Sequence, residues 1–508
     1  MECPQLESKI TLLMRNKIQL GELAIPILFV GLLFFIILSS TVFINYNPKY
    51  VTLLDIGPLN IFSLIIFSAI CFLGFLSDRN YIFFLPIQLL AMPAPVDDFF
   101  LSVLLTSASD IKQIYFPIIT HIDIYLALGI FRKIILVKPK IYKGGFLLPI
   151  VLLLMFFVLL SNLLFSVDYW DFYLLLAHTY HFRYLVLLLI LSYYYNFSKY
   201  ENPIIYGIVL AVALVFSESV INTYLLDTER LVSGTLGNNS YANIIAAIMF
   251  FFIWLRKYNQ LSRKITYPIL LLLLIIILAT QTRMALISPF FVILVYFIYS
   301  LKQNFLLRFI KLIGMLSIFF FAYIYLVKNN YIPKRYSIEQ LLNSKNGSLV
   351  LKDNAESSSI LTRIMLFKTS LKMIKDNPID GIGVGRFNRY KKNYGFKYNV
   401  LIDSHNDLLS LTSQYGIIVG FLFLFCMTLL PLVYYLYFLK NIINNKLVFL
   451  FIINFSMFFS GLTNTALMKH QIFAFLAFNL IVLDSLVKLT KIEDSQKLHI
   501  NENSNIRD

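Results

Sequence analysis

Long apolar runs separated by short polar segments make up most of the chain. Many of these runs reach about 18 residues, the length that an α-helix needs to cross the hydrocarbon core of a bilayer. The pattern predicts about fourteen membrane-spanning helices, or twelve because prolines and the Asp97–Asp98 pair interrupt the third and fourth runs. The predicted spans are Leu23–Ile44, Leu59–Leu76, Tyr81–Thr106, Tyr115–Phe131, Phe146–Val167, Phe172–Asn196, Pro203–Leu226, Tyr241–Leu255, Tyr267–Thr280, Met284–Leu301, Leu306–Val327, Leu411–Leu439, Leu447–Leu462 and Gln471–Val487.

One polar stretch, residues 328–410, is much longer than the others and contains an amphipathic segment of its own. Ser358 or Ser359 can cap the start of a helix there, and Pro378 should end it. Basic residues decorate the helix, so it suits a surface that carries anionic headgroups. Its apolar residues follow helical spacing: Ile360, Ile364, Phe367, Leu371 and Ile374.

The runs divide the chain into four predicted parts. Residues 1–327 hold the first eleven spans, and residues 328–410 form one large loop. Residues 411–487 hold the last three spans, and residues 488–508 form a polar tail that we expect to be disordered. The predicted fold class is therefore an all-α polytopic membrane protein with one large extracytoplasmic loop.

Composition and charge support this fold class and orient it. Hydrophobic residues make up 59% of the chain and charged residues 14%, which is too apolar for a soluble domain. With the N-terminus inside, 23 Lys and Arg fall on the cytoplasmic side and five in the short loops opposite. This asymmetry is the positive-inside bias. It places residues 328–410 outside the cytoplasm, and it explains the net charge of +16 without any nucleic-acid partner.

Known motifs for metals and nucleotides do not occur in the sequence. The three cysteines lie far apart, and neither a zinc pattern nor a Walker-type phosphate loop is found. Asp97 and Asp98 alone are a thin basis for a divalent ion. We therefore expect no metal and no cofactor, with the energy for any reaction supplied by an activated substrate.

Arg283 is the most informative single residue, because it interrupts an apolar hairpin at its outer tip. A charge near hydrocarbon is costly, and positive-inside statistics disfavour it on the outer side. The planar guanidinium suits bidentate phosphate binding, although a structural ion pair is the alternative. The same hypothesis applies more weakly to Arg230.

A second polar group precedes the twelfth span. Histidine accepts protons near neutral pH, so His405 is a candidate general base, with Asp403 or Asn406 to orient its ring. A helix cap or a solvated residue is the alternative. Upstream, the glycines of "GIGVG" indicate a tight turn, or a set of backbone N–H groups that cradles a phosphate. These glycines are Gly381, Gly383 and Gly385.

A third group lies in the outer half of the sixth span, at His178, His181 and Arg183. Ionisable residues within a span are functional candidates by default. These three could line a cavity for a lipid-linked anion, or they could pair with one another.

Four segments occur in order over about 190 residues: "RLVSGTLGNNSYAN", "TQTRMALI", "TRIMLFKTSLKMIKDNPIDGIGVGRF" and "DSHNDLLSLTSQYGIIVG". Together they resemble the bacterial O-antigen ligase and O-antigen polymerase superfamily. The resemblance implies a GT-C-like glycosyltransferase of the inner membrane, with its site facing the periplasm. One departure is that "TQT" precedes the second arginine, where related sequences often have serine.

The resemblance also implies roles for residues. His405, Arg283 and Arg230 match catalytic positions. The substrate-binding positions would include Asn406, Asp403, Arg363, Gly381, Gly383, Gly385 and Asn238, to which the span analysis adds His181 and Arg183.

The implied reaction is metal-independent and inverting. The donor is a glycan on undecaprenyl diphosphate, and the acceptor is the lipid A-core for a ligase or a lipid-linked glycan for a polymerase. Three alternatives stay open: a polymerase, transfer to a protein, and a flippase or transporter with arginines along its pathway. A flippase does not need a large basic outer loop, and inverted repeats are not apparent.

Overall fold

The structure is a computed structural model. It describes residues 58–92, 102–106, 113–117, 120–136, 180–225, 238–257, 262–280, 358–383, 386–396, 404–429, 447–461, 467 and 471–487. All structural statements below concern these residues.

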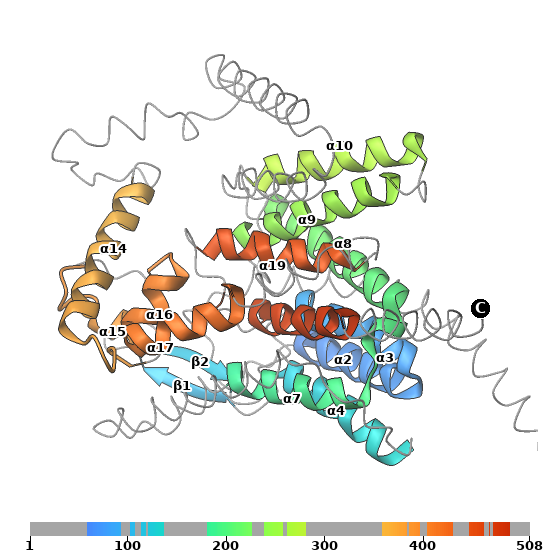
Figure 1. The fold of residues 1–508 in the computed structure, drawn as a ribbon, viewed down its shortest axis with the longest axis horizontal. Helices are drawn as coiled ribbons and strands as arrows, with labels where there is room; N and C mark the ends of the chain where they lie inside the picture. Colours follow the sequence, from blue (N-terminus) through green and yellow to red (C-terminus); the bar gives the residue numbers. More distant parts are fainter. Residues whose placement is uncertain are drawn as a thin grey trace, which may run out of the picture.

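The described part is built mainly from helices that pack side by side (Figure 1). Several predicted spans appear as helices with bounds within a few residues of those predicted. The helices before the large loop are α2 (Pro58–Leu76), α3 (Asp78–Leu90), α4 (His121–Leu136), α7 (Tyr180–Tyr194), the short η2 (Phe197–Tyr200), α8 (Glu201–Leu225), α9 (Asn238–Lys257) and α10 (Arg263–Thr280). Those after residue 357 are α14 (Ser358–Asp376), α15 (Phe387–Tyr390), α16 (Asp407–Tyr415), α17 (Ile417–Leu424), the π-helical turn η4 (Phe425–Leu429), α19 (Val448–Gly461) and a last helix, Gln471–Val487.

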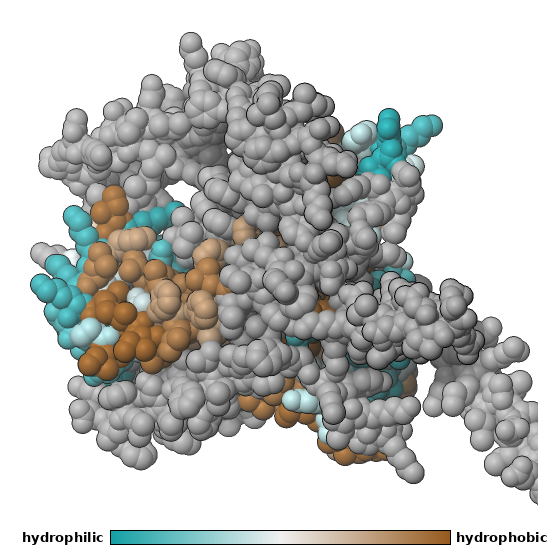
Figure 2. All heavy atoms as spheres, in the orientation of Figure 1, coloured by the Kyte–Doolittle hydropathy of each residue, from teal (hydrophilic) through white to brown (hydrophobic). Residues whose placement is uncertain are grey.

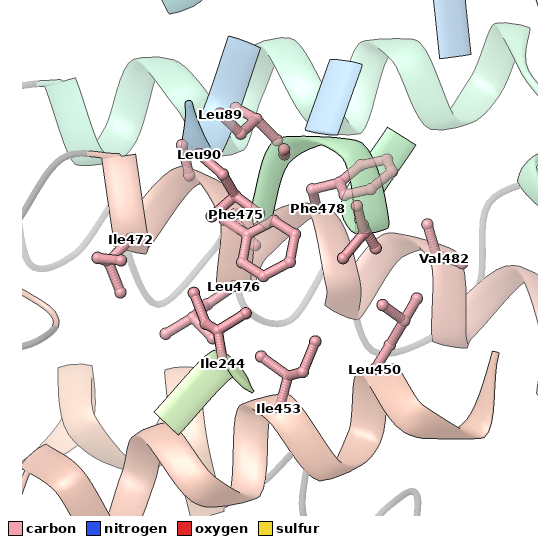
Figure 3. Close-up of a cluster of buried hydrophobic side chains, with 14 of the residues drawn as sticks. Leu89, Leu90, Ile244, Leu450, Ile453, Ile472, Phe475, Leu476, Phe478 and Val482 are labelled. Carbon is pink, nitrogen blue, oxygen red and sulfur yellow. The ribbon is translucent and has the colours of Figure 1, made fainter. Parts of the chain in front are cut away.

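The last helix, Gln471–Val487, lies at the centre of the hydrophobic core. Figure 3 shows its side chains between Leu89 and Leu90 of α3 on one side and side chains of α9 and α19 on the other. Nearly every residue of this helix is buried. A helix that is apolar on all sides belongs in the interior of a bundle, which is where this one lies.

A cluster of charged residues marks one end of the bundle. Asp78, at the start of α3, pairs with Arg132 and Lys133, which lie near the end of α4. The Nζ of Lys133 lies 2.6 Å from the Asp78 carboxylate. The hydroxyl of Tyr200 also donates to Asp78, over 3.2 Å, just before α8 begins. We call this the Asp78 end. The predicted topology places all of these residues on the cytoplasmic side.

Different polar contacts mark the opposite end. His121, the first residue of α4, bonds through its ring to the Gln88 carbonyl near the end of α3. The Gln471 side chain donates to the Met92 carbonyl over 2.8 Å. The ends that meet here are the ones that the predicted alternation places outside the cytoplasm. The described contacts therefore agree with the predicted alternation of helix directions.

The outward faces of several helices are apolar. By length and composition, one helix of the described part, Phe197–Val220, is long and apolar enough to cross a membrane, and six shorter apolar helices accompany it. Large hydrophobic side chains are exposed on the outside of the bundle, a surface that lipid would favour and water would not. Examples are Phe72, Phe131, Tyr206, Leu271 and Ile275. The number of spans stays a prediction, and the first, fifth, tenth and eleventh predicted spans lie outside the described residues.

The all-α prediction holds for most of the described part but misses one antiparallel pair of strands. The predicted spans Tyr81–Thr106 and Tyr115–Phe131 give way to α3, then to an antiparallel pair of strands, then to α4. The strands are β1 (Ser102–Thr106) and β2 (Gln113–Pro117), with Leu104 opposite Tyr115. Pro93 and Pro95, which follow α3, lack the backbone donors that a continuous helix requires. The β-branched and aromatic residues of these segments favour strands.

The predicted span Leu411–Leu439 is also wrong at its start, and the predicted loop boundary at residue 410 falls inside a helix. Helix α16 begins at Asp407 and ends at Tyr415, and α17 begins a new direction at Ile417. Gly416 between them has a φ of 84°, a left-handed conformation that ends an α-helix. In contrast, the amphipathic helix predicted in the loop is confirmed as α14.

A small second core holds the segment after α14 together. Leu366 and Met373 of α14 pack with Ile382, Phe387 and Phe396. Lys391 is buried beside this core, with its Nζ 5.3 Å from the centre of the Phe396 ring. Burial, and then the charge of Lys392, lower the pKa of Lys391 from 10.5 to about 8.

This lowered pKa predicts a specific dependence of stability on pH. Between pH 8 and 10.5 the unfolded chain binds more protons at this position than the folded chain does, so stability rises with pH across that window. We expect Lys391→Met to stabilise the protein at pH 7 by about 1–2 kcal/mol after allowance for solvent screening. Thermal unfolding in detergent should show this advantage shrinking as the pH approaches 10.5.

The matched control is Lys375→Met, which removes an exposed lysine of α14. Its effect on the unfolding temperature shows what the loss of an exposed lysine does by itself. An advantage of Lys391→Met that did not change with pH would contradict the assigned pKa.

Candidate functional site

The turn before α16 holds a histidine in an unusual conformation. His405 has a φ of 52°, and it is the only non-glycine residue of the described part with a positive φ. Such a backbone conformation costs roughly 1–2 kcal/mol, and it is often found at functional sites. The ring nitrogen Nδ1 is buried, whereas the residue as a whole is partly exposed. The exposed surface of His405 therefore belongs to atoms other than Nδ1.

The residues on either side of His405 fix this turn. The hydroxyl of Ser404 donates to the Asn406 carbonyl over 2.8 Å, and both residues are buried. Asn406 is the N-cap of α16, and its side-chain oxygen accepts a hydrogen bond from the Leu409 N–H over 2.9 Å. This contact gives Asn406 a capping role in the described structure.

Asp407 ties the same turn to the helix bundle. Its carboxylate is buried and accepts a hydrogen bond from the Leu467 N–H over 3.1 Å. It also lies against Gly461, the last residue of α19, where an added Cβ would come within 2.3 Å of the carboxylate. The sequence analysis did not single out Asp407. The signal was a second polar residue after His405, at the start of a helix, but its partner lies 60 residues away.

The other end of α16 is bonded to the segment that follows α14. The N–H groups of Ile382 and Gly383 donate to the carbonyls of Ser413 and Gln414, over 2.9 and 3.1 Å. These carbonyls are the groups that a helix leaves unsatisfied at its C-terminus. The Ile417 N–H in turn donates to the Pro378 carbonyl over 2.8 Å. The segment and α16 are therefore fixed to one another through main-chain hydrogen bonds.

These bonds correct one hypothesis about the glycines. Gly381 and Gly383 both have positive φ, as a tight turn requires. Their N–H groups donate to the carbonyls of Asn377 and Gln414, so they are bonded within the protein and do not form a phosphate cradle. The close approach of the two backbones at Gly381 leaves no room for a side chain.

Arg183 has a carboxylate partner. Its guanidinium bonds to both oxygens of Asp123 on α4, over 3.2 and 2.9 Å. Asp123 also accepts from the N–H and the hydroxyl of Thr120, and that hydroxyl lies 2.6 Å from the Tyr184 hydroxyl. The partner of Arg183 is thus a residue outside the predicted group, and this ion pair links α7 to α4. Spacing along the sequence could not show this pair.

The remaining candidates are only partly placed. Arg363 lies partly exposed on α14, and Asn238 is the first residue of α9. His181 lies in the first turn of α7. Arg230, Arg283, Asp403, Gly385 and His178 lie outside the described residues.

The neighbours of the two key arginines can still be placed along the bundle. Phe251, in the second half of α9, packs against Phe449 at the start of α19, with ring centres 4.9 Å apart. Figure 3 shows Ile244, near the start of α9, beside Ile453 and on the side away from Leu450. The two helices are therefore antiparallel, and the start of α9 lies towards Gly461, which contacts Asp407. Helix α10 follows α9 after a short connection and packs against it, so its last residue, Thr280, lies towards the same end.

Arg230 precedes α9 by eight residues, and Arg283 follows α10 by three. Both arginines are thus joined to helix ends on the His405 side of the bundle. The described residues contain no group of three His, Cys, Asp or Glu side chains arranged to hold a metal ion.

The segment that carries this geometry has a match among known families. Residues 268–424 match the family model described as O-antigen ligase. The match confirms the predicted resemblance to the O-antigen ligase superfamily. It contains Arg283, Arg363 and the turn from Ser404 to Asp407. Among curated proteins, none matches the chain.

The backbone contact at Gly416 gives a testable prediction. A Cβ on this glycine would lie 1.8 Å from the Ile379 carbonyl oxygen, in addition to the strain of its positive φ. We expect Gly416→Ala to lower the thermal unfolding temperature in detergent, at a cost of about 2–4 kcal/mol.

Gly395→Ala is the control, because Gly395 also has a positive φ but an added Cβ would make only an ordinary contact there. It should cost about 1 kcal/mol, from backbone strain alone. Equal losses for the two variants would show that the contact between Gly416 and Ile379 adds nothing to stability.

Proposed function

We propose that the protein is a membrane glycosyltransferase of the O-antigen ligase type. It transfers a glycan from undecaprenyl diphosphate to a sugar hydroxyl of the lipid A-core. The reaction takes place at the periplasmic face of the bacterial inner membrane. The match to the O-antigen ligase family over residues 268–424 supports the class of reaction.

The observation that carries the proposal is the conformation of His405. It lies within the matched segment, and its strained backbone is held by Ser404, Asn406 and Asp407. A ring that is fixed in place and partly exposed suits a general base, because little freedom is lost when the acceptor binds. A simple capping role does not explain the conformation, because Asn406 is the residue that caps α16.

In the proposed step, His405 accepts the proton of the acceptor hydroxyl at Nε2. The hydroxyl oxygen attacks the anomeric carbon of the donor and forms the new glycosidic bond. The bond from that carbon to the diphosphate oxygen breaks, and its electron pair stays on the undecaprenyl diphosphate that leaves. A single displacement of this kind inverts the configuration at the anomeric carbon.

Arg230 and Arg283 stabilise the charge that develops on the diphosphate. A guanidinium binds two phosphate oxygens at once, and its interaction strengthens as the leaving group gains charge. The positions of the adjoining helix ends support this role, because α9 starts and α10 ends on the His405 side of the bundle. Neither step requires a metal ion, and we expect a chelator to leave the activity intact.

The same chemistry serves a polymerase, which joins lipid-linked repeat units. Deletion of the gene followed by gel analysis of lipopolysaccharide separates the two. Loss of all glycan-capped lipid A-core indicates a ligase, whereas a single repeat on the core indicates a polymerase. Unchanged lipopolysaccharide would contradict both.

A substitution at position 405 tests the general base. His405→Asn removes the base but keeps a residue type that tolerates a left-handed backbone. We expect glycan transfer to fall by about 10²–10⁴-fold, the usual contribution of a general base. The assay measures transfer from the undecaprenyl-diphosphate donor by the purified full chain.

His405→Ala should lose as much activity and should also lower the unfolding temperature, because alanine is strained at this φ. Comparison of the two variants separates chemistry from folding. Near-normal transfer by His405→Asn would remove the base assignment.

A second substitution tests phosphate binding. Arg283→Lys keeps the charge but loses the planar fork, and we expect a loss in kcat/KM of about 10²-fold or more. Arg263→Lys is the matched control, because Arg263 is an exposed residue at the opposite end of α10. Wild-type activity of Arg283→Lys would exclude bidentate binding, and an equal loss in both variants would point to a general effect on α10.

A further inference from the structure

Helix α14 has an exposed face that is apolar along one half and basic along the other. Three large apolar side chains are exposed on it, at Ile364, Phe367 and Leu371. At about 100° per residue, these three fall within about 60° of one another around the helix. The opposite face, which includes Leu366 and Met373, is buried against the rest of the protein.

A row of lysines borders the apolar row. Lys368, Lys372 and Lys375 are exposed, and they also fall within about 60° of one another, directly beside the apolar row. A helix with one apolar and one basic edge can lie in the surface of a bilayer, with its apolar side chains among the acyl chains. Lysine side chains then reach back to the headgroups.

The apolar surface continues beyond α14. Ile379 is exposed in the segment after α14, and it lies next to Gly416 at the start of α17. Ile418 and Phe421 are exposed on α17, the helix that begins after the break at Gly416 within the twelfth predicted span. Figure 2 shows an apolar patch where Figure 1 places α14 and α17, with hydrophilic surface at its border.

The direction of α14 fits the same arrangement. In Figure 1, α14 runs steeply across the direction of α19 and α7. If those helices cross a bilayer, α14 lies along its surface at the level where α17 begins. The main-chain bonds from Ile382 and Gly383 to α16 hold it there.

We propose that the exposed face of α14 binds the anionic phospholipid headgroups of the outer leaflet, with Ile364, Phe367 and Leu371 inserted below them. The charge argues for this occupant, because three lysines border one apolar row. Near an anionic leaflet each lysine favours binding by about fivefold, the equivalent of about 1 kcal/mol. The proposal requires that the bundle crosses a membrane, but it does not depend on glycan transfer.

The test places a nitroxide label on the full chain in lipid nanodiscs. The label is attached at Leu371→Cys, in the apolar row, or at Asp376→Cys, an exposed position about 140° away around the same helix. Both variants are made after the native cysteines are replaced. The accessibility of each label to oxygen and to a water-soluble nickel chelate reports its depth.

In discs that contain phosphatidylglycerol, we expect oxygen to reach the Leu371→Cys label and the chelate to reach the Asp376→Cys label. Lys368→Glu combined with Lys372→Glu should reduce the inserted population by about tenfold or more. Arg263→Glu combined with Lys264→Glu, both at exposed positions at the start of α10, should leave it unchanged. If the charge variant fails to fold, high salt with the unaltered lysines gives the same test.

Four outcomes would overturn the proposal. Equal exposure of the two labels to the chelate would show that α14 stays in water. Recognition of anionic headgroups would be excluded if insertion were the same in phosphatidylcholine discs as in those with phosphatidylglycerol, and if the lysine variant did not change it. Shielding of the Leu371→Cys label from the chelate that persists in detergent and rises with protein concentration would assign the face to a second copy of the chain. Shielding of the Leu371→Cys label from the chelate by inorganic phosphate, without lipid, would assign the face to a soluble anion.

Discussion

The geometry of the site depends on the short helix α16, because both of its ends are bonded to other parts of the chain. At its C-terminus, the last carbonyls accept hydrogen bonds from Ile382 and Gly383. At its N-terminus, buried Asp407 accepts a bond from Leu467 and lies against Gly461. A buried polar group that loses its partner costs about 1–3 kcal/mol, so these contacts are hard to give up separately. Helix α16 therefore fixes the segment after α14 to the bundle, and His405 lies where the two meet.

The strain at His405 follows from these contacts. A left-handed histidine is unfavourable by itself, and it persists only where the surrounding structure determines it. Here the cap at Asn406 and the hydroxyl of Ser404 fix the backbone on one side of the ring. A base that is fixed before the substrate arrives spares the reaction part of the entropy cost of positioning. Under the proposed function, the residues that cap and anchor this turn therefore contribute to catalysis by holding His405, and they do not contact the substrate themselves.

Local pattern predicted the single helices well and the contacts between them poorly. Helix α14 was predicted from its apolar spacing, a capping serine and Pro378, all of which act within a few residues. The break at Gly416 was missed, since its apolar surroundings resemble a continuous span while its φ depends on the contact with Ile379. Arg183 and Asp123 are 60 residues apart, and a side-chain pair at that distance leaves no periodic signal. The polar group before the twelfth predicted span and the resemblance both pointed to His405, but Asp407 was recognised only from its packing.

The distribution of charge links the two proposals. At the Asp78 end, Arg132 and Lys133 both pair with Asp78, so one of their two positive charges is offset within the protein. At the other end, α14 keeps a row of exposed lysines on a segment that the positive-inside bias places outside the cytoplasm. The bias largely exempts loops as long as this one, so its basic residues are tolerated there, and an anionic partner on the same side supplies a physical reason to keep them. Anionic headgroups and a lipid diphosphate both carry negative charge at the membrane surface. A loop that the headgroups hold against the bilayer is therefore also positioned to meet the lipid diphosphate.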